Sequence, residues 1–400
     1  MKCFLRNSTS NRCIMPDVGQ SQTLRRLEAD LETLRAQGQL RHLSNPAGIQ
    51  LSSNDYLGLS LDPRLKNAIV RALEKDQRIA STGSRLLSGN SERWEQLESE
   101  FAHFAGTEAA LYFPSGYAAN VGLLSSILKP TDTVFSDSGN HASLIDGIRL
   151  SRARKIVFPH LDLAYLEDAL PRSDGHGEKI VVVESVFSMD GDRTPLREMM
   201  AICERYGAGL VVDEAHTTGV EGLHGRGMVN SAGRTGCVLA TVHTCGKALA
   251  SMGAFVAGSH TLRDFLINYA RTFIFTTALP PYCAAHVREA LSLAAKADAE
   301  RDRLIELSRY LRQRLRASGF ETGRSDSHII PLVLGTNDAA LRVAAAINAA
   351  GFAIRAIRPP TVPPGTARLR LSLNARLSIA DLDVFTEALV AARANEAVRE

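Results

Sequence analysis

The sequence predicts an α/β protein with a large domain, built on a mostly parallel seven-stranded sheet, and a smaller C-terminal α+β domain. Two observations lead to this fold class. Seven short apolar runs alternate with helical patterns between residues 110 and 257, and strands joined by helices form the crossover units of parallel sheets. The alternation ends at Pro280 and Pro281, where one long helical pattern begins.

The seven apolar runs are the length of strands and are bounded by polar or turn-forming residues. The predicted strands are 110–113, 133–135, 155–158, 180–184, 209–213, 238–242 and 254–257. The intervening helical patterns include the stripe Trp94, Leu97, Phe101 and Phe104, whose spacing predicts packing against the sheet. A sheet covered on both faces follows from this arrangement.

The C-terminal part has a different order of elements. Its long helix is predicted to run to about residue 318, and the elements beyond it are strands at 329–334, 352–356 and 367–372, a helix at 338–350 and a last helix. We therefore predict an N-terminal extension and helix at 1–47, a large domain at 48–290 and a small domain at 291–400.

The N-terminal segment predicts one amphipathic helix, because leucines recur at spacings of three and four. These leucines are Leu24, Leu27, Leu31 and Leu34. We expect this helix to pack on the main body. Residues 1–14 precede Met15, a second candidate start, and lack the continuous apolar run of a signal peptide.

The composition favours small-molecule chemistry in the cytoplasm. Hydrophobic residues make up 45% and charged residues 22% of the 400, as in ordinary globular proteins. The 46 basic and 43 acidic side chains nearly cancel without forming like-charge blocks, so neither nucleic acid nor a membrane is an expected partner. The six cysteines form no Cys-x-x-Cys pair, which argues against a zinc site and a disulfide framework.

Polar residues follow three of the predicted strands, where ligands of open parallel sheets bind. Asp213 ends one strand and is followed by His216. Lys247 comes shortly after another strand, in a place where partial desolvation favours the neutral, nucleophilic amine. The third strand leads into Ser115 and Gly116, which begin a helix whose free amides can bind a phosphate.

Each of these features alone is common in structural roles: a helix cap, a solvated lysine or an ordinary turn. Together they meet the needs of pyridoxal phosphate, which are a lysine to carry it, an acid for its pyridine nitrogen and an anion site. A zinc hydrolase built from His141, His216 and His243 is an alternative from another class, but no helical His-x-x-x-His pair supports it. A helicase is excluded because Lys247 has no phosphate-loop pattern around it.

Several longer segments resemble the α-oxoamine synthases, pyridoxal-phosphate-dependent transferases of fold type I. The resemblance extends from about Leu51 to the C-terminal helix. The matching segments are 51–59, 82–89, 115–120, 140–147, 184–192, 209–216, 242–248, 276–281 and 357–361. It implies that an amino acid condenses with an acyl thioester and that carbon dioxide is lost.

The resemblance also assigns catalytic roles. It implies that Lys247 carries the cofactor, that Asp213 pairs with the pyridine nitrogen and that His141 stacks on the ring. Ser188 and His216 would contact the phenolic oxygen of the ring.

A phosphate site shared between two subunits is implied as well. The residues assigned to it are Ser115, Gly116, Tyr117 and Thr244, with Thr276 and Thr277 reaching across from a second subunit. A homodimer with shared active sites is therefore expected.

The substrate site follows from the same resemblance. Arg370 would grip the amino-acid carboxylate, a task suited to a bidentate guanidinium, with Asn54 near it. Arg41 and Thr361 fall in the region expected to bind the acyl substrate, which is an acyl-coenzyme A or an acyl-carrier protein.

The run 359–366 favours the member of the family that joins L-alanine to a pimeloyl thioester in biotin synthesis. Members that use glycine or serine remain open, because they would keep the same cofactor residues. Thr217, Ala250 and Met252 depart from the commoner residues near the cofactor and leave the choice of amino acid open. A role in secondary metabolism is also open.

Overall fold

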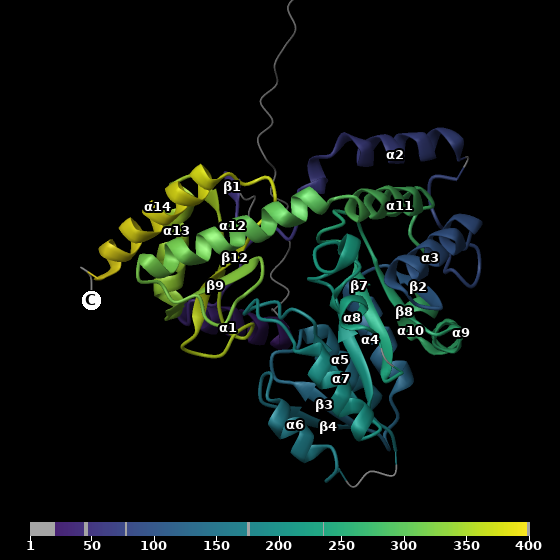
Figure 1. The fold of residues 1–400 in the computed structure, drawn as a ribbon. Coiled ribbons are helices and arrows are strands. Elements are labelled where there is room, and N and C mark those ends of the chain that lie inside the picture. The colour runs from purple at the N-terminus through teal and green to yellow at the C-terminus, as the bar shows by residue number, and fades with distance from the viewer. Residues whose placement is uncertain (1–20, 44–46, 77, 174–176, 235, 398–400) are drawn as a thin grey trace, which may run out of the picture.

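The computed structural model describes residues 21–43, 47–76, 78–173, 177–234 and 236–397. Its main body is a seven-stranded sheet covered by helices, and a second group of helices and short strands lies beside it (Figure 1). The strands of the main sheet are β2 (Ala109–Phe113), β3 (Thr133–Asp137), β4 (Arg154–Phe158), β5 (Lys179–Glu184), β6 (Gly209–Asp213), β7 (Val238–Thr244) and β8 (Ala254–Gly258).

The prediction of the mostly parallel sheet is confirmed. The strand order is β2-β8-β7-β6-β5-β3-β4, and every neighbouring pair is parallel except the two that involve β8. Strand β8 runs the other way because it follows β7 through a short loop, whereas a parallel neighbour would need a crossover helix. Lys247 lies in that loop.

Both faces of the sheet are buried, as its alternating contacts show. In β5, Ile180 and Val182 join one hydrophobic cluster, while Val181 and Val183 join the opposite one. The helices of the first face are α4 (Gly116–Ile127), α5 (Ala142–Ser151), α9 (His260–Tyr269) and α10 (Arg271–Ile274). Those of the second face are α3 (Glu92–Ala105), α6 (Leu163–Ala169), α7 (Leu196–Arg205) and α8 (Met228–Ala232).

The aromatic stripe of α3 packs against the sheet, as its spacing predicts. Trp94, Leu97 and Phe101 are fully buried or nearly so, and the Phe101 ring stacks on Phe255 of β8 at 3.9 Å between centroids. The remaining elements before the C-terminal part are α2 (Pro63–Lys75) and the 3-10 turns η1 (Leu59–Leu61) and η2 (Leu223–Gly225).

The C-terminal part holds an antiparallel sheet in the order β11-β12-β9 and a parallel pair of β1 with β10. Its strands are β1 (Ile49–Gln50), β9 (Ile329–Gly335), β10 (Phe352–Ala353), β11 (Ala356–Ile357) and β12 (Ala367–Ser372). Its helices are α11 (Tyr282–Ala295), α12 (Asp298–Ala317), α13 (Asn337–Ala349) and α14 (Ile379–Ala397). The predicted domain boundary at 290 falls within α11, and the division into domains stays a prediction.

The single strand predicted at 352–356 is wrong, because β10 and β11 are separate and belong to different sheets. The Asn348 side chain accounts for the break. It accepts the N–H of Ile354 at 2.9 Å and donates to the carbonyl of Ile354 at 3.2 Å, so these backbone groups are not available to a ladder.

The N-terminal helix is α1 (Gln22–Ala36), and the prediction of its place is right. The expectation that its leucines pack on the body is not met, because Leu24, Leu27 and Leu31 are about half exposed at 51%, 46% and 49%. Just after α1, Asn337 donates a 2.8 Å hydrogen bond to the carbonyl of Gln37. Residues 1–14 and Met15 lie outside the described residues.

Within the described ranges, no helix is long and apolar enough to cross a membrane. Over the same ranges, no group of three or more histidine, cysteine or acidic side chains could hold a metal ion.

Candidate active site

The candidate site lies at the carboxyl ends of the central strands. Asp213 ends β6 and Glu184 ends β5, and the two residues are paired in the sheet register. Thr244 ends β7, the next strand in the sheet. Because the carboxyl ends of parallel strands meet at one edge, the topology brings these polar residues together although they are distant in sequence.

Lys247 lies in the loop between β7 and β8, which is closed by backbone hydrogen bonds. The N–H of Cys245 donates to Gly253 at 2.9 Å, and that of Ser251 donates back to Cys245 at 2.8 Å. Burial lowers the pKa of Lys247 to about 8, although the charges of Asp213 and Glu184 act in the opposite direction. A useful fraction of its amine is therefore neutral near pH 7.

The amine of Lys247 begins a chain of buried hydrogen bonds. Its Nζ lies 2.8 Å from Nε2 of His216, and Nδ1 of that ring lies 2.5 Å from the Tyr56 hydroxyl. Burial and the charge of Lys247 hold the pKa of His216 well below its usual value, so the imidazole is neutral.

The chain continues from Tyr56 to the predicted carboxylate-binding residues. The Tyr56 hydroxyl donates to Oδ1 of Asn54 at 3.0 Å, and Arg370 donates to the same oxygen at 3.1 Å. Arg370 also donates to the hydroxyl of Ser372 at 2.6 Å and to the carbonyl of Ser188. The guanidinium of Arg370 is buried, which makes it a strong site for a small anion.

Asp213 is buried, and its carboxylate is oriented by two donors. Asn120 of α4 donates to Oδ2 at 2.7 Å, and the backbone N–H of Ala215 donates to Oδ1 at 2.9 Å. The Asn120 amide also donates to Ser143 at 2.9 Å. Two fixed donors keep the position of this carboxylate defined, as an acid facing a heterocyclic nitrogen requires.

Glu184 is a second buried acid beside Asp213. Burial and the charge of Asp213 raise its pKa to about 8. Its Oε2 accepts the N–H of Ser188 at 3.1 Å. Ser188 is thus held from both sides, by Glu184 at its N–H and by Arg370 at its carbonyl.

His141 caps the N-terminus of α5 and leaves part of its ring accessible. Its Nδ1 accepts the N–H of Ser143 at 3.2 Å and lies 2.8 Å from the hydroxyl of the same residue. These contacts fix the ring from one edge, so a face of the imidazole remains for a planar ligand.

The start of α4 lies against the end of β7, which supports a shared anion site. Ser115 caps the helix by accepting the N–H of Ala118 at 3.1 Å, and a Cβ built on Gly116 would lie 3.2 Å from Oγ1 of Thr244. The amides of Gly116 and Tyr117 have no acceptor within the helix. The Tyr117 ring is half exposed, and its hydroxyl donates to Asp146.

Two pairs of residues that the sequence assigned to the site lie outside the hydrogen-bonded chain from Lys247 to Arg370. Thr276 and Thr277 line a small pocket with Phe273. Arg41 and Thr361 are exposed and share a 3.4 Å hydrogen bond.

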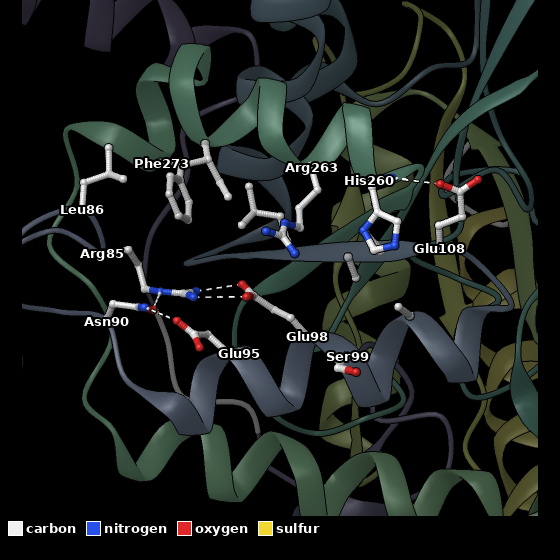
Figure 2. Close-up of a pocket in the computed structure, with 15 residues that line it drawn as sticks. Arg85, Leu86, Asn90, Glu95, Glu98, Ser99, Glu108, His260, Arg263 and Phe273 are labelled. Atoms are coloured by element: carbon white, nitrogen blue, oxygen red, sulfur yellow. Dashed lines mark hydrogen bonds and ion pairs between the residues drawn. The ribbon is translucent and has the colours of Figure 1, made fainter.

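A cavity of about 430 Å³ lies at the β2 edge of the sheet, and no predicted site residue lines it. Figure 2 shows its main polar contact, in which Arg85 donates two hydrogen bonds, of 2.8 and 3.1 Å, to the carboxylate of Glu98. Glu98 also accepts the N–H of Tyr112 at 2.8 Å, so this ion pair fixes β2 against α3.

Sequence reasoning missed several members of the site. Tyr56, Asn120 and Glu184 lie inside segments that were matched to the family, but the patterns gave them no role. His328, at the start of β9, had no signal, and its buried ring meets Tyr56 edge-on at 4.0 Å between centroids. His243 contacts Thr218 and Thr241 at 2.9 Å each, which gives no support to the zinc alternative.

Known proteins are similar to this chain over most of its length. A family model described as aminotransferase class I and II matches residues 46–389. The chain is 44% identical to an 8-amino-7-oxononanoate synthase of Lysinibacillus sphaericus, over 83% of this chain and 85% of the relative. It is 43% identical to the enzyme of that name from Geobacter sulfurreducens, over 90% and 95%.

Two solved structures are also similar to this chain over most of its length. A serine palmitoyltransferase of Sphingomonas wittichii aligns with a TM-score of 0.87 at 31% identity and covers 94% of this chain and 98% of its own. An 8-amino-7-oxononanoate synthase from Francisella tularensis aligns with a TM-score of 0.76 at 30% identity, over 87% and 98%.

Proposed function

Because the chain belongs to the aminotransferase class I and II family, we propose that it is a pyridoxal-phosphate-dependent α-oxoamine synthase, and specifically an 8-amino-7-oxononanoate synthase. The reaction joins L-alanine to a pimeloyl thioester and releases carbon dioxide, a free thiol and an α-amino ketone. The observation that carries the proposal is the hydrogen-bonded chain that leads from the amine of Lys247 to the buried guanidinium of Arg370.

The residues present suit pyridoxal phosphate. Lys247 supplies an amine of lowered pKa, Asp213 a fixed carboxylate, and the start of α4 with Thr244 a cradle in which a side chain at Gly116 would crowd. When bound, the cofactor withdraws electrons from the substrate carbon attached to it. The charge of Asp213 would keep its ring nitrogen protonated, and His141 would lie against its face.

Arg370 and Asn54 would hold the carboxylate of the amino acid. A carboxylate can accept two parallel hydrogen bonds from a guanidinium, which fixes its direction as well as its position. The contact between Arg370 and Asn54 prepares both side chains before substrate arrives.

Lys247 would then act as the base. Its neutral amine would accept the proton from the α-carbon of the amino acid. The neutral His216 accepts a hydrogen bond from this amine and holds it in place. Ser188 and His216 would contact the phenolic oxygen.

The curated relatives support L-alanine and pimeloyl thioester as substrates, because those at 43 to 44% identity carry the name 8-amino-7-oxononanoate synthase. A serine palmitoyltransferase activity is the second candidate, and the TM-score of 0.87 favours it. The higher sequence identity to the curated relatives supports the 8-amino-7-oxononanoate synthase activity as the first candidate.

We also propose a homodimer in the cytoplasm. Thr276 and Thr277 would complete the phosphate site of a second subunit, since in this chain they line a separate pocket. Arg41 and Thr361 would contact the acyl substrate.

The test is thiol release by the cofactor-loaded protein with pimeloyl-coenzyme A, pimeloyl-carrier protein or palmitoyl-coenzyme A, each combined with L-alanine, glycine or L-serine. Release that requires L-alanine supports the proposal. Release only with L-serine and a palmitoyl donor would replace it with the second candidate. A Lys247→Ala variant should be inactive under every condition.

A further inference from the structure

His160 joins two loops that lead into the site. Its Nδ1 lies 2.8 Å from Oδ1 of Asp137, at the end of β3, and its Nε2 lies 2.9 Å from Oδ2 of Asp192. Both carboxylates are almost fully buried, while the imidazole is partly exposed. Both ring nitrogens face carboxylate oxygens, so both donate when the ring carries two protons.

Each aspartate also makes hydrogen bonds within its own loop, Asp137 through its carboxylate and Asp192 through its backbone carbonyl. Asp137 accepts the N–H of Gly139 at 2.7 Å and the N–H of Leu161 at 2.9 Å. The carbonyl of Asp192 accepts the N–H of Phe187 at 3.0 Å. Gly139 precedes His141 by two residues, and Phe187 directly precedes Ser188.

The imidazole also fills the space between these loops. The Phe187 ring meets it edge-on, with centroids 4.4 Å apart and planes at 90°. A Cβ built on Gly139 would lie only 2.9 Å from its Nδ1. The loops that bear His141 and Ser188 therefore both pack against this one side chain.

We infer that His160 is a positioning residue, whose imidazolium holds the His141 loop and the Ser188 loop together in the arrangement that the cofactor needs. The inference rests on the proposed function for the roles of His141 and Ser188. His160 touches neither cofactor nor substrate in this account and acts only through its two carboxylate partners.

The charges explain why a histidine is suited to this place. Burial alone would lower the pKa of His160, but the hydrogen bonds and charges of Asp137 and Asp192 raise it to about 10. The ring is therefore an imidazolium at neutral pH. Without it, two buried carboxylates would face each other without neutralisation, and their repulsion would push the loops apart.

The test compares His160→Gln, Asp192→Asn and the double variant, with His103→Gln as the matched control on an exposed part of α3. Three quantities are measured: the affinity of the cofactor-free protein for pyridoxal phosphate, the visible circular dichroism of the bound cofactor, and kcat and KM for the amino acid. Thermal unfolding shows which variants fold.

For His160→Gln we expect at least tenfold weaker cofactor binding, an altered dichroic band, and a kcat that falls more than KM rises. The control should match the native protein. The double variant should recover part of the cofactor affinity, because Asp192→Asn removes one of the repelling charges. Such a recovery would show that the defect of His160→Gln comes from the uncompensated charges of the carboxylates and not from the loss of packing alone.

Native cofactor affinity and dichroism in His160→Gln would overturn the inference. So would a double variant that binds no better than His160→Gln. If His160→Gln does not fold, the double variant must fold and bind cofactor, and its failure to do so would overturn the inference. Cofactor binding needs no substrate, so normal binding without condensation would count against the proposed function alone.

Discussion

The amine of Lys247 and Nε2 of His216 lie 2.8 Å apart, in a geometry that sets the direction of the hydrogen bond between them. The Tyr56 hydroxyl gives its single proton to Asn54, so its oxygen accepts from Nδ1–H of His216. The neutral imidazole then has a lone pair only at Nε2, and Lys247 must be the donor. This leaves the lone pair of the neutral amine free to react.

Replacing Lys247 by Ala should abolish both stable cofactor binding and thiol release. Lys247→Arg keeps a positive charge but offers no amine that can bind the cofactor covalently, so it should be equally inactive. Cofactor absorbance after gel filtration and a thiol assay measure the two effects. Substantial turnover in Lys247→Arg would show that another residue carries the cofactor.

The rate of cofactor loading should depend on pH through the amine of Lys247. Its pKa is lowered to about 8, so the neutral fraction is roughly a tenth at pH 7 and nearly complete at pH 9. The loading rate, followed by absorbance, should rise between pH 7 and about pH 9 and then level off. A rate that still rises tenfold between pH 9 and 10 would indicate an ordinary lysine.

Tyr56→Phe should lower kcat by about tenfold. The change removes the hydrogen bond to Nδ1 of His216, so this ring is no longer held in the protonation state in which Nε2 accepts from Lys247. The ring of Tyr56 is fully buried and its volume is kept, so the fold should survive at a cost of about 1–3 kcal/mol. Steady-state kinetics and urea unfolding measure both quantities. Unchanged kcat would mean that the direction of this bond is irrelevant.

Arg370→Lys should raise KM for the amino acid by at least about tenfold, since an ammonium cannot donate two parallel hydrogen bonds to a carboxylate. Cofactor affinity should change little. As a control, Arg376→Lys alters an arginine outside the site, whose side chain donates to the carbonyl of Gly58 at 2.7 Å. An equal rise of KM in both variants would argue against a carboxylate site at Arg370.

The stability of the protein should fall in alkaline solution through His160. The pKa of this group is raised from 6.5 to about 10 in the folded state, so its contribution is complete below about pH 6.5 and is lost as pH rises to 10. The urea midpoint of the native protein should therefore drop more between pH 7 and 10 than that of His160→Gln. Equal drops would assign the effect to other groups.

The sequence allowed the main sheet to be predicted because each strand is a local apolar run. All seven predicted strands occur, Asp213 ends β6, and Lys247 follows the end of β7 by three residues. The site residues that were missed depend on pairing across the chain. Tyr56 lies 160 residues from His216, and no local pattern records that contact.

Local patterns also gave wrong predictions where contacts between distant segments determine the structure. The side chain of Asn348 divides the strand predicted at 352–356, and its influence cannot be read from the apolar run itself. The leucines of α1 have the right spacing for a buried face, but in the described chain nothing covers that face enough to bury them. Spacing predicts that a helix has an apolar side, and not what lies against it.

The reversal of β8 also restricts the number of residues that can connect it to β7. Both ends of the connection are fixed by the hydrogen bonds between Cys245 and Gly253, and Lys247 lies between them. One inserted residue adds up to about 3.5 Å of chain, more than the 2.8 Å that separates the amine from His216. Insertions and deletions here should therefore be as harmful as loss of the lysine.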